Sequence, residues 1–132
     1  MEQPGLCALV VDDFLPMRRI VTYELRNIPE IKLIAEASDA PEAVQLAKQL
    51  QPDLIVLDIG LPTQNGIEAA GKILEFSPRS KILFLSQELS YEIIHKALAT
   101  GAKGYVCKMH LVRFLLMAVK AILRGETAVM AG

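Results

Sequence analysis

Short apolar runs alternate along the chain with longer segments of helical periodicity. The runs are LCALVV (6–11), IKLIAEA (31–37), LIVL (54–57), KILFLS (81–86) and GYVCK (104–108). Runs that are apolar without alternation, such as the first and third, are typical of strands covered on both faces, as in a parallel sheet. Lys32 and Glu36 interrupt the second run, which favours a position at the edge of the sheet.

Each apolar run is followed by a segment that predicts a helix. These segments are 16–28, 40–50, 66–76, 90–101 and 111–125. Pro16 suits a first helical turn, Asp39 and Ser90 suit N-caps, and Gly101 suits a left-handed C-terminal stop. Strict alternation of strand and helix predicts a doubly wound α/β fold, with five parallel strands and helices on both faces.

Composition limits the kind of protein that this fold can be. The chain has 132 residues, the length of one domain, and a formal net charge of -1, so we expect no broad basic surface and no direct contact with nucleic acid. Cys7 and Cys107 lie in apolar runs and are predicted to be buried thiols rather than a disulfide. We see neither a signal peptide nor a stretch long enough to span a membrane, so we expect a soluble, cytoplasmic protein.

Polar residues stand where the predicted strands end. They are Asp12 and Asp13 after the first strand, Asp58 after the third, Ser86 at the end of the fourth and Lys108 at the end of the fifth. The carboxyl ends of the strands form the ligand-binding edge of an open α/β sheet. We therefore expect these five side chains to meet at one edge.

This set of residue types suits phosphoryl transfer. Carboxylates gathered in one place disfavour one another's ionisation, and Mg²⁺, which prefers oxygen ligands, removes that conflict, so Asp12 and Asp13 are predicted to be metal-site acids. The carboxylate of Asp58 could attack phosphorus and form an aspartyl phosphate. The Lys108 ammonium would neutralise developing charge, and the Ser86 hydroxyl would hydrogen-bond a phosphoryl oxygen.

With these residues in order, the sequence resembles the receiver (phosphoacceptor) domain of two-component response regulators. The resemblance covers about residues 6–124 and rests on VVDD, LDIGLPTQNGIE, the strand end at Ser86 and GAKGYVCK. The stretches LDIGLPTQNGIEAA and AVKAILRGE look most like the LuxR/NarL branch, whose output is a C-terminal helix-turn-helix domain. The resemblance implies a flavodoxin-like sheet in the order 2-1-3-4-5.

The resemblance also implies roles for the acidic residues. Asp58 would accept the phosphoryl group. Asp13 and Asp58 would bind Mg²⁺ directly together with the backbone carbonyl of Gly60, while Asp12 would act mainly through water.

The remaining implied roles belong to the fourth and fifth strands. Ser86 and Lys108 would contact the phosphoryl group, and Tyr105 matches an aromatic position that turns inward on activation. The family usually has a proline joined by a cis bond after the lysine, where this chain has Met109. A non-proline cis bond costs about 3–4 kcal/mol, so either the site maintains that cost or the bond is trans and presents Lys108 differently.

The implied function is that of a signalling switch rather than an enzyme acting on released substrates. A sensor histidine kinase would donate the phosphoryl group, and phosphorylation would promote a homodimer and control a DNA-binding output domain. We expect residues 1–132 to form a single receiver domain, and expect the chain to be a fragment from which the output domain has been removed.

Two other functions remain open from the sequence. A receiver-like module for dimerisation or docking that is independent of phosphorylation would tolerate the loss of the proline after Lys108. An aspartyl-phosphate phosphatase of haloacid-dehalogenase type would need a second acid two residues after Asp58, where Gly60 stands.

The last predicted helix is apolar almost all round, since only Arg113 and Lys120 interrupt residues 111–123. Four of its residues have no evident place in the sheet-facing stripe: Leu116, Met117, Ala121 and Leu123. We therefore expect this surface to pack on a second receiver or on an output domain.

Overall fold

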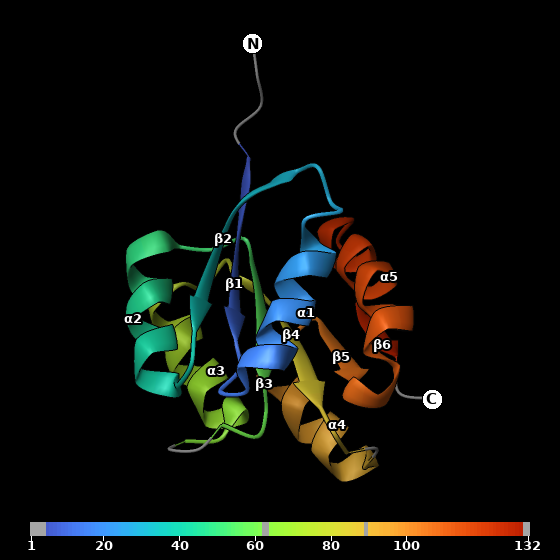
Figure 1. Cartoon of the computed structure of the whole chain (residues 1–132). Coiled ribbons are helices and arrows are strands. Elements are labelled where there is room, and N and C mark those ends of the chain that lie inside the picture. The colour runs from blue at the N-terminus through green and yellow to red at the C-terminus, as the bar shows by residue number, and fades with distance from the viewer. Residues whose placement is uncertain (1–4, 62–63, 89, 131–132) are drawn as a thin grey trace.

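A parallel sheet runs through the middle of the molecule, with helices on both of its faces (Figure 1). The computed structural model describes residues 5–61, 64–88 and 90–130. The strands are β1 (Leu6–Val11), β2 (Ile31–Ala37), β3 (Leu54–Asp58), β4 (Lys81–Ser86), β5 (Gly104–Cys107) and β6 (Ala128–Met130). Their order across the sheet is β2-β1-β3-β4-β5-β6, which confirms the predicted order of the first five.

The helices begin close to the positions that the sequence predicts. They are α1 (Leu15–Leu25), α2 (Ala40–Leu50), α3 (Gly66–Phe76), α4 (Tyr91–Ala99) and α5 (Leu111–Leu123), and a short 3₁₀ helix precedes α5 at Lys108–His110. The carboxylate of Asp39 accepts a hydrogen bond from the Glu42 amide at 2.9 Å, as an N-cap does. Ser90 caps α4 in the same way, and Gly101 after α4 has a φ of 99°.

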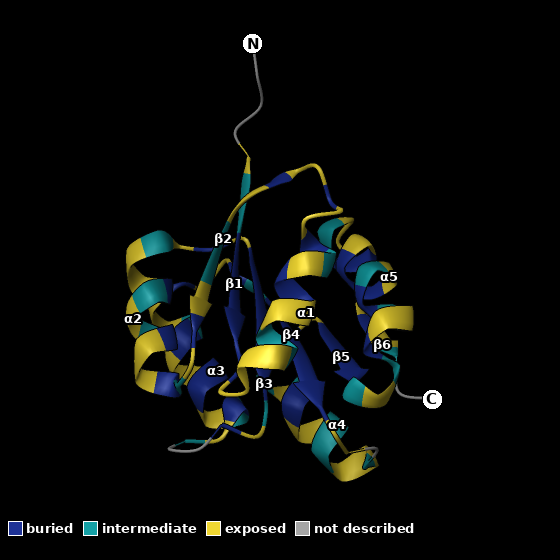
Figure 2. Ribbon diagram, viewed as in Figure 1, coloured by how far each residue is buried: buried dark blue, intermediate teal, exposed yellow. Residues whose placement is uncertain are grey.

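Two hydrophobic layers cover the sheet, one on each face. Ala8 and Val10 of β1 belong to the layer shared with α1 and α5, while Leu9 and Val11 belong to the layer shared with α2, α3 and α4. Figure 2 shows the central strands buried between helices whose outer surfaces are exposed, while the edge strand β2 is partly exposed. Because β3 and β5 are buried along their whole length, the polar groups that they offer to a ligand lie at their ends, whereas the edge strand β2 exposes Lys32 and Glu36.

A sixth strand extends the sheet beyond the five that the sequence predicts. Strand β6 pairs in parallel with β5, and the Ala128 amide donates a hydrogen bond to the Lys103 carbonyl at 2.9 Å. A Cβ on Gly104 would lie 2.8 Å from the Ala128 carbonyl oxygen, so glycine at this position permits the close approach. Three residues are too few to show a strand pattern in the sequence.

Strand β6 and the core account for part of the apolar surface of α5. Ala121 is buried, and Leu116 and Leu123 pack partly buried against the layer shared with α1. The expectation that these three residues lack a core role is therefore wrong. Met117 remains 56% exposed.

Both cysteines are free thiols, but the prediction that both are buried is wrong for Cys7, which stands near the start of β1. Cys107 is buried, whereas Cys7 is only partly buried. Within the described ranges, no helix has the length and apolar character needed to cross a membrane.

Candidate functional site

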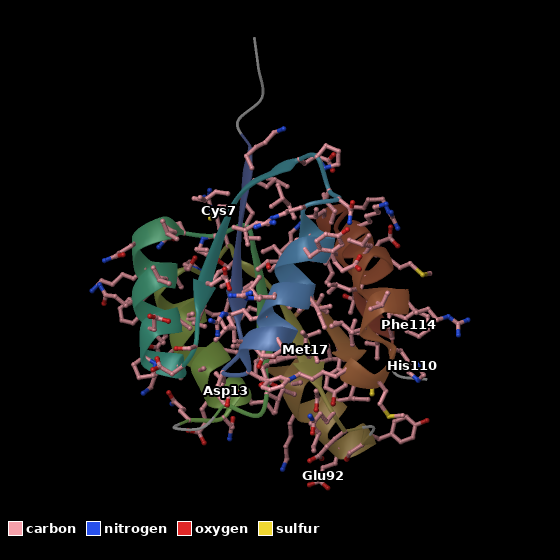
Figure 3. The ribbon with its side chains drawn as sticks, in the orientation of Figure 1. Cys7, Asp13, Met17, Glu92, His110 and Phe114 are labelled. Atoms are coloured by element: carbon pink, nitrogen blue, oxygen red, sulfur yellow. The ribbon has the colours of Figure 1, made fainter. Side chains whose placement is uncertain are left out.

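A cavity of about 410 Å³ opens at the carboxyl ends of β1, β3, β4 and β5. The predicted acidic, hydroxyl and lysine side chains all line it: Asp12, Asp13, Asp58, Ser86 and Lys108. Figure 3 shows Asp13 and Met17 at this end of the molecule, on the chain that leads from β1 into α1. The structure therefore brings together the residues that the sequence places at strand ends.

Three carboxylates form the floor of the cavity. One oxygen from each of Asp12, Asp13 and Asp58 lies within 4.8 Å of the others, and Asp13 is the exposed member of the set. The backbone dictates this grouping, because Asp58 is the last residue of β3 and Asp12 follows β1, the neighbouring strand. The Phe14 amide donates a hydrogen bond to Asp12 Oδ1 at 2.9 Å and fixes the orientation of that carboxylate.

Lys108 is the cation of the site. Its Nζ lies 3.1 Å from Asp12 Oδ2 and 3.1 Å from Asp58 Oδ1, and its side chain is only 9% exposed. The peptide bond between Lys108 and Met109 is trans. A trans bond is therefore compatible with direct contact between this ammonium and the carboxylate of Asp58.

Burial disfavours the charged form of Asp12, although Lys108 lies beside it. Desolvation raises the pKa of Asp12, and the charge of Asp58 raises it further, while the Phe14 amide and Lys108 act in the opposite direction. Asp12 Oδ2 is buried and has no hydrogen-bond partner among the described residues. Its 3.1 Å contact with the Lys108 ammonium is an ion pair. An all-oxygen donor set with an unsatisfied buried oxygen fits Mg²⁺.

Two glycines shape the chain around Asp58. The Gly60 amide donates a hydrogen bond to Asp58 Oδ1 at 3.0 Å, and a Cβ on Gly60 would have ordinary clearance from that oxygen. At Gly66 an added Cβ would collide with the Asp58 carbonyl, while the Gly66 amide donates to the Ile59 carbonyl at 2.7 Å. Sequence reasoning missed Gly66, because close backbone approach between residues eight apart leaves no local pattern.

Ser86 and Tyr105 both contact Glu88, in the loop that follows β4. The Glu88 amide donates a hydrogen bond to Ser86 Oγ at 3.1 Å, and the Tyr105 hydroxyl donates to the Glu88 carbonyl at 2.7 Å. Tyr105 is fully buried, and this burial raises the pKa of its hydroxyl. The aromatic ring thus points inward, and the backbone of Glu88 connects it to Ser86.

The fold and the site define a class of protein, a flavodoxin-like α/β domain with an acidic cluster at the carboxyl ends of its strands. Residues 8–120 match the family described as response regulator receiver domain. The chain therefore belongs to the response regulator receiver domain family. Receiver domains hold Mg²⁺ in this acidic pocket, and the oxygen donors of Asp12, Asp13 and Asp58 fit such an ion.

Relatives assign the chain to the LuxR/NarL-like branch, as the resemblance predicts. It is 35% identical over 125 residues to the nitrate/nitrite response regulator protein NarL of Escherichia coli (strain K12), covering 95% of this chain and 58% of that protein. It is 33% identical over 117 residues to the transcriptional regulatory protein DegU of Brevibacillus brevis, covering 89% of this chain and 50% of that protein. The chain thus spans little more than half the length of these relatives.

A solved structure agrees with this assignment. The crystal structure of a LuxR-family two-component response regulator from Aurantimonas sp. SI85-9A1 superposes with a TM-score of 0.89 at 33% identity. The match covers 96% of this chain and 90% of that one.

Proposed function

We propose that this domain accepts a phosphoryl group on Asp58 from a sensor histidine kinase, with Mg²⁺ as cofactor. The observation that supports this most directly is the convergence on Asp58 of a lysine ammonium at 3.1 Å and two further carboxylates. A buried acid at the end of a core strand lowers stability unless it has partners or a function. Here the partners are those that phosphoryl transfer needs.

In the proposed reaction a carboxylate oxygen of Asp58 attacks the phosphorus of a phosphohistidine. The new O–P bond forms as the P–N bond breaks, and the imidazole leaves with the electron pair of that bond. Oδ1 of Asp58 already accepts from the Gly60 amide and pairs with Lys108, whereas Oδ2 makes no such contact within the described ranges. We therefore assign Oδ2 as the attacking oxygen.

Charge neutralisation is the main contribution of the site. Bound Mg²⁺ would offset the charge on the phosphoryl oxygens. Asp13 and Asp58, with the carbonyl of Gly60, would hold the ion directly, and Asp12 would hold it through water. Lys108 is placed to contact the phosphoryl group once the ion takes over part of the carboxylate charge.

The switch would work through Ser86 and Tyr105. The Ser86 hydroxyl would donate a hydrogen bond to a phosphoryl oxygen on Asp58. Movement of Ser86 toward that oxygen would alter the bond that its Oγ accepts from the Glu88 amide, so phosphorylation would change the loop that Tyr105 contacts. Such a ligand shifts a two-state equilibrium only by its differential interaction with the two states. The contact between Tyr105 and the Glu88 carbonyl is the element whose population would change.

The proposed readout is transcription. DegU is named a transcriptional regulatory protein, and both DegU and NarL are longer than this chain. A DNA-binding output domain and a homodimer formed on phosphorylation are therefore the proposed partners. Contact with DNA would be made by that output domain rather than by the residues described above.

Intact-mass spectrometry with acetyl phosphate and Mg²⁺ tests the proposal. The native chain should gain one phosphoryl group, and the adduct should be lost in Asp58→Asn and in EDTA. Asp39→Asn is a matched control, because asparagine preserves an N-cap and this residue lies outside the cavity.

Two outcomes would replace this function with another. If the native chain forms no adduct and does not respond to beryllofluoride, a phosphorylation-independent docking module is the better account. Sustained release of phosphate from small phosphate esters would instead indicate a phosphatase.

A further inference from the structure

An arginine outside the acidic cluster holds the turn that carries two of its carboxylates. Arg18 lies in the second turn of α1, and its side chain is only 16% exposed. Its Nη1 donates a hydrogen bond to the Asp12 carbonyl at 2.7 Å. Its Nε donates to Glu36 Oε1 at 2.8 Å. One guanidinium thus bridges the turn after β1 and the end of β2.

The remaining contacts of this turn show what Arg18 adds. The Asp12 amide donates a hydrogen bond to the Ala37 carbonyl at 3.1 Å, so the end of β2 fixes the position of this amide. The Phe14 amide holds the carboxylate through Oδ1. Among the described residues, only Arg18 donates a hydrogen bond to the Asp12 carbonyl. This carbonyl belongs to the peptide unit that joins Asp12 to Asp13.

The contact acts through geometry more than through charge. Glu36 pairs with the guanidinium, so much of the positive charge of Arg18 is balanced before it reaches the cavity. The planar guanidinium donates in two fixed directions at once, which a lysine ammonium cannot reproduce. The Asp12 carboxylate, meanwhile, has an oxygen within 4.8 Å of oxygens of Asp13 and Asp58, and like charges at this separation repel one another.

We propose that Arg18 and Glu36 form a clamp that fixes the Asp12–Asp13 turn and thereby sets the affinity of the site for Mg²⁺. This inference rests on the proposed function. Without the clamp, repulsion between the carboxylates would spread the turn, and binding would include the entropic cost of ordering it. Arg18 is thus a positioning residue that touches neither the ion nor the phosphoryl group.

Mg²⁺ titration of the whole chain, followed by isothermal calorimetry or by amide NMR shifts, tests the clamp. Arg18→Met should raise the Mg²⁺ dissociation constant about 10-fold, as loss of an outer-shell partner does. Arg18→Lys should give an intermediate increase, and Glu36→Gln a smaller one, because glutamine can still accept from Nε. Arg19→Lys, on the exposed surface of the same helix, should match the native chain.

A second readout separates positioning from general destabilisation. Labelling by acetyl phosphate should be slow in Arg18→Lys at low Mg²⁺ and should return to the native rate at saturating Mg²⁺. Equal dissociation constants for the native chain, Arg18→Lys and Glu36→Gln would overturn the clamp and leave the proposed function intact. A native chain that binds no Mg²⁺ would overturn both.

Discussion

At the scale of single residues, Asp12 shows how the site depends on a cation. The residue is fully buried, and its Oδ2 has an ion pair but no hydrogen bond within the described part of the chain. Folding raises its pKa mainly by desolvation, so the ionised carboxylate is less stable in the folded chain than in the unfolded chain. Function and stability therefore oppose each other at this position.

Asp12→Asn is expected to stabilise the fold when no metal is present. Because the folded-state pKa of Asp12 lies above its unfolded value, the folded state binds more protons, and stability falls as the pH rises through this interval. Asparagine has no such titration. In EDTA at neutral pH, Asp12→Asn should melt at a higher temperature than the native chain. The difference between the two melting temperatures should shrink in acid.

In the presence of Mg²⁺, the native chain should melt at a higher temperature than Asp12→Asn. A ligand that binds only the folded state adds about 2.7 kcal/mol at one hundred times its dissociation constant. The native chain should gain more from Mg²⁺ than Asp12→Asn does. Thermal melts with and without Mg²⁺ measure both effects, and a variant that melts below the native chain in EDTA would contradict this reasoning.

At the scale of elements, β6 gives the edge of the sheet a partner. It pairs with β5, the strand that carries Tyr105, and lies against α5. Gly104 makes this approach possible, since an added Cβ would lie 2.8 Å from the Ala128 carbonyl oxygen and from side-chain carbons of Ile122 and Leu83. The segment after α5 is therefore part of the domain's packing.

Gly104→Ala should destabilise the domain by about 1–3 kcal/mol through overpacking. Gly71→Ala is the matched control, because a Cβ there meets nothing within 4 Å and Gly71 lies inside α3. That change should stabilise the chain by about 0.5–1 kcal/mol. Denaturant unfolding of the two variants checks the pair, and equal effects of the two substitutions would argue against close packing by β6.

The sequence predicts the elements more completely than the contacts between them. Apolar runs give the five main strands, and Asp58, Ser86 and Lys108 can be placed at their ends, because strand ends converge in any parallel sheet. The clamp at Arg18 is not predictable in this way, since its partners come from a turn and from β2. Gly66 and β6 are missed for a similar reason: each depends on a backbone approach that leaves no periodic pattern.

At the scale of the whole molecule, the site lies at one end of the sheet and Tyr105 connects it to β5 and β6. Ser86 and Tyr105 contact opposite ends of the same residue, the amide and the carbonyl of Glu88. In the proposed function, a phosphoryl group on Asp58 would contact Ser86, and the change would pass through Glu88 to Tyr105. Helix α2 packs on β1 and β2, toward the other edge of the sheet from β5, and makes none of the hydrogen bonds described for Glu88 (Figure 1).

Beryllofluoride, which stands in for the phosphoryl group on an aspartate, should shift amide NMR signals along this path. We expect changes at Glu88, Tyr105 and Ala128, with residues 40–50 of α2 unchanged. Shifts confined to residues that line the cavity would mean that Tyr105 does not respond to the site.

In the proposed function, three carboxylates and a lysine surround one divalent ion and hold a transferred phosphoryl group on Asp58. A crystal structure of this chain grown with Mg²⁺ and beryllofluoride tests it most directly. We expect one ion bonded to Asp13 and Asp58, with beryllofluoride on the Asp58 carboxylate in contact with Lys108 and Ser86. An ion bound elsewhere, or a carboxylate of Asp58 that carries no beryllofluoride at saturating concentration, would contradict it.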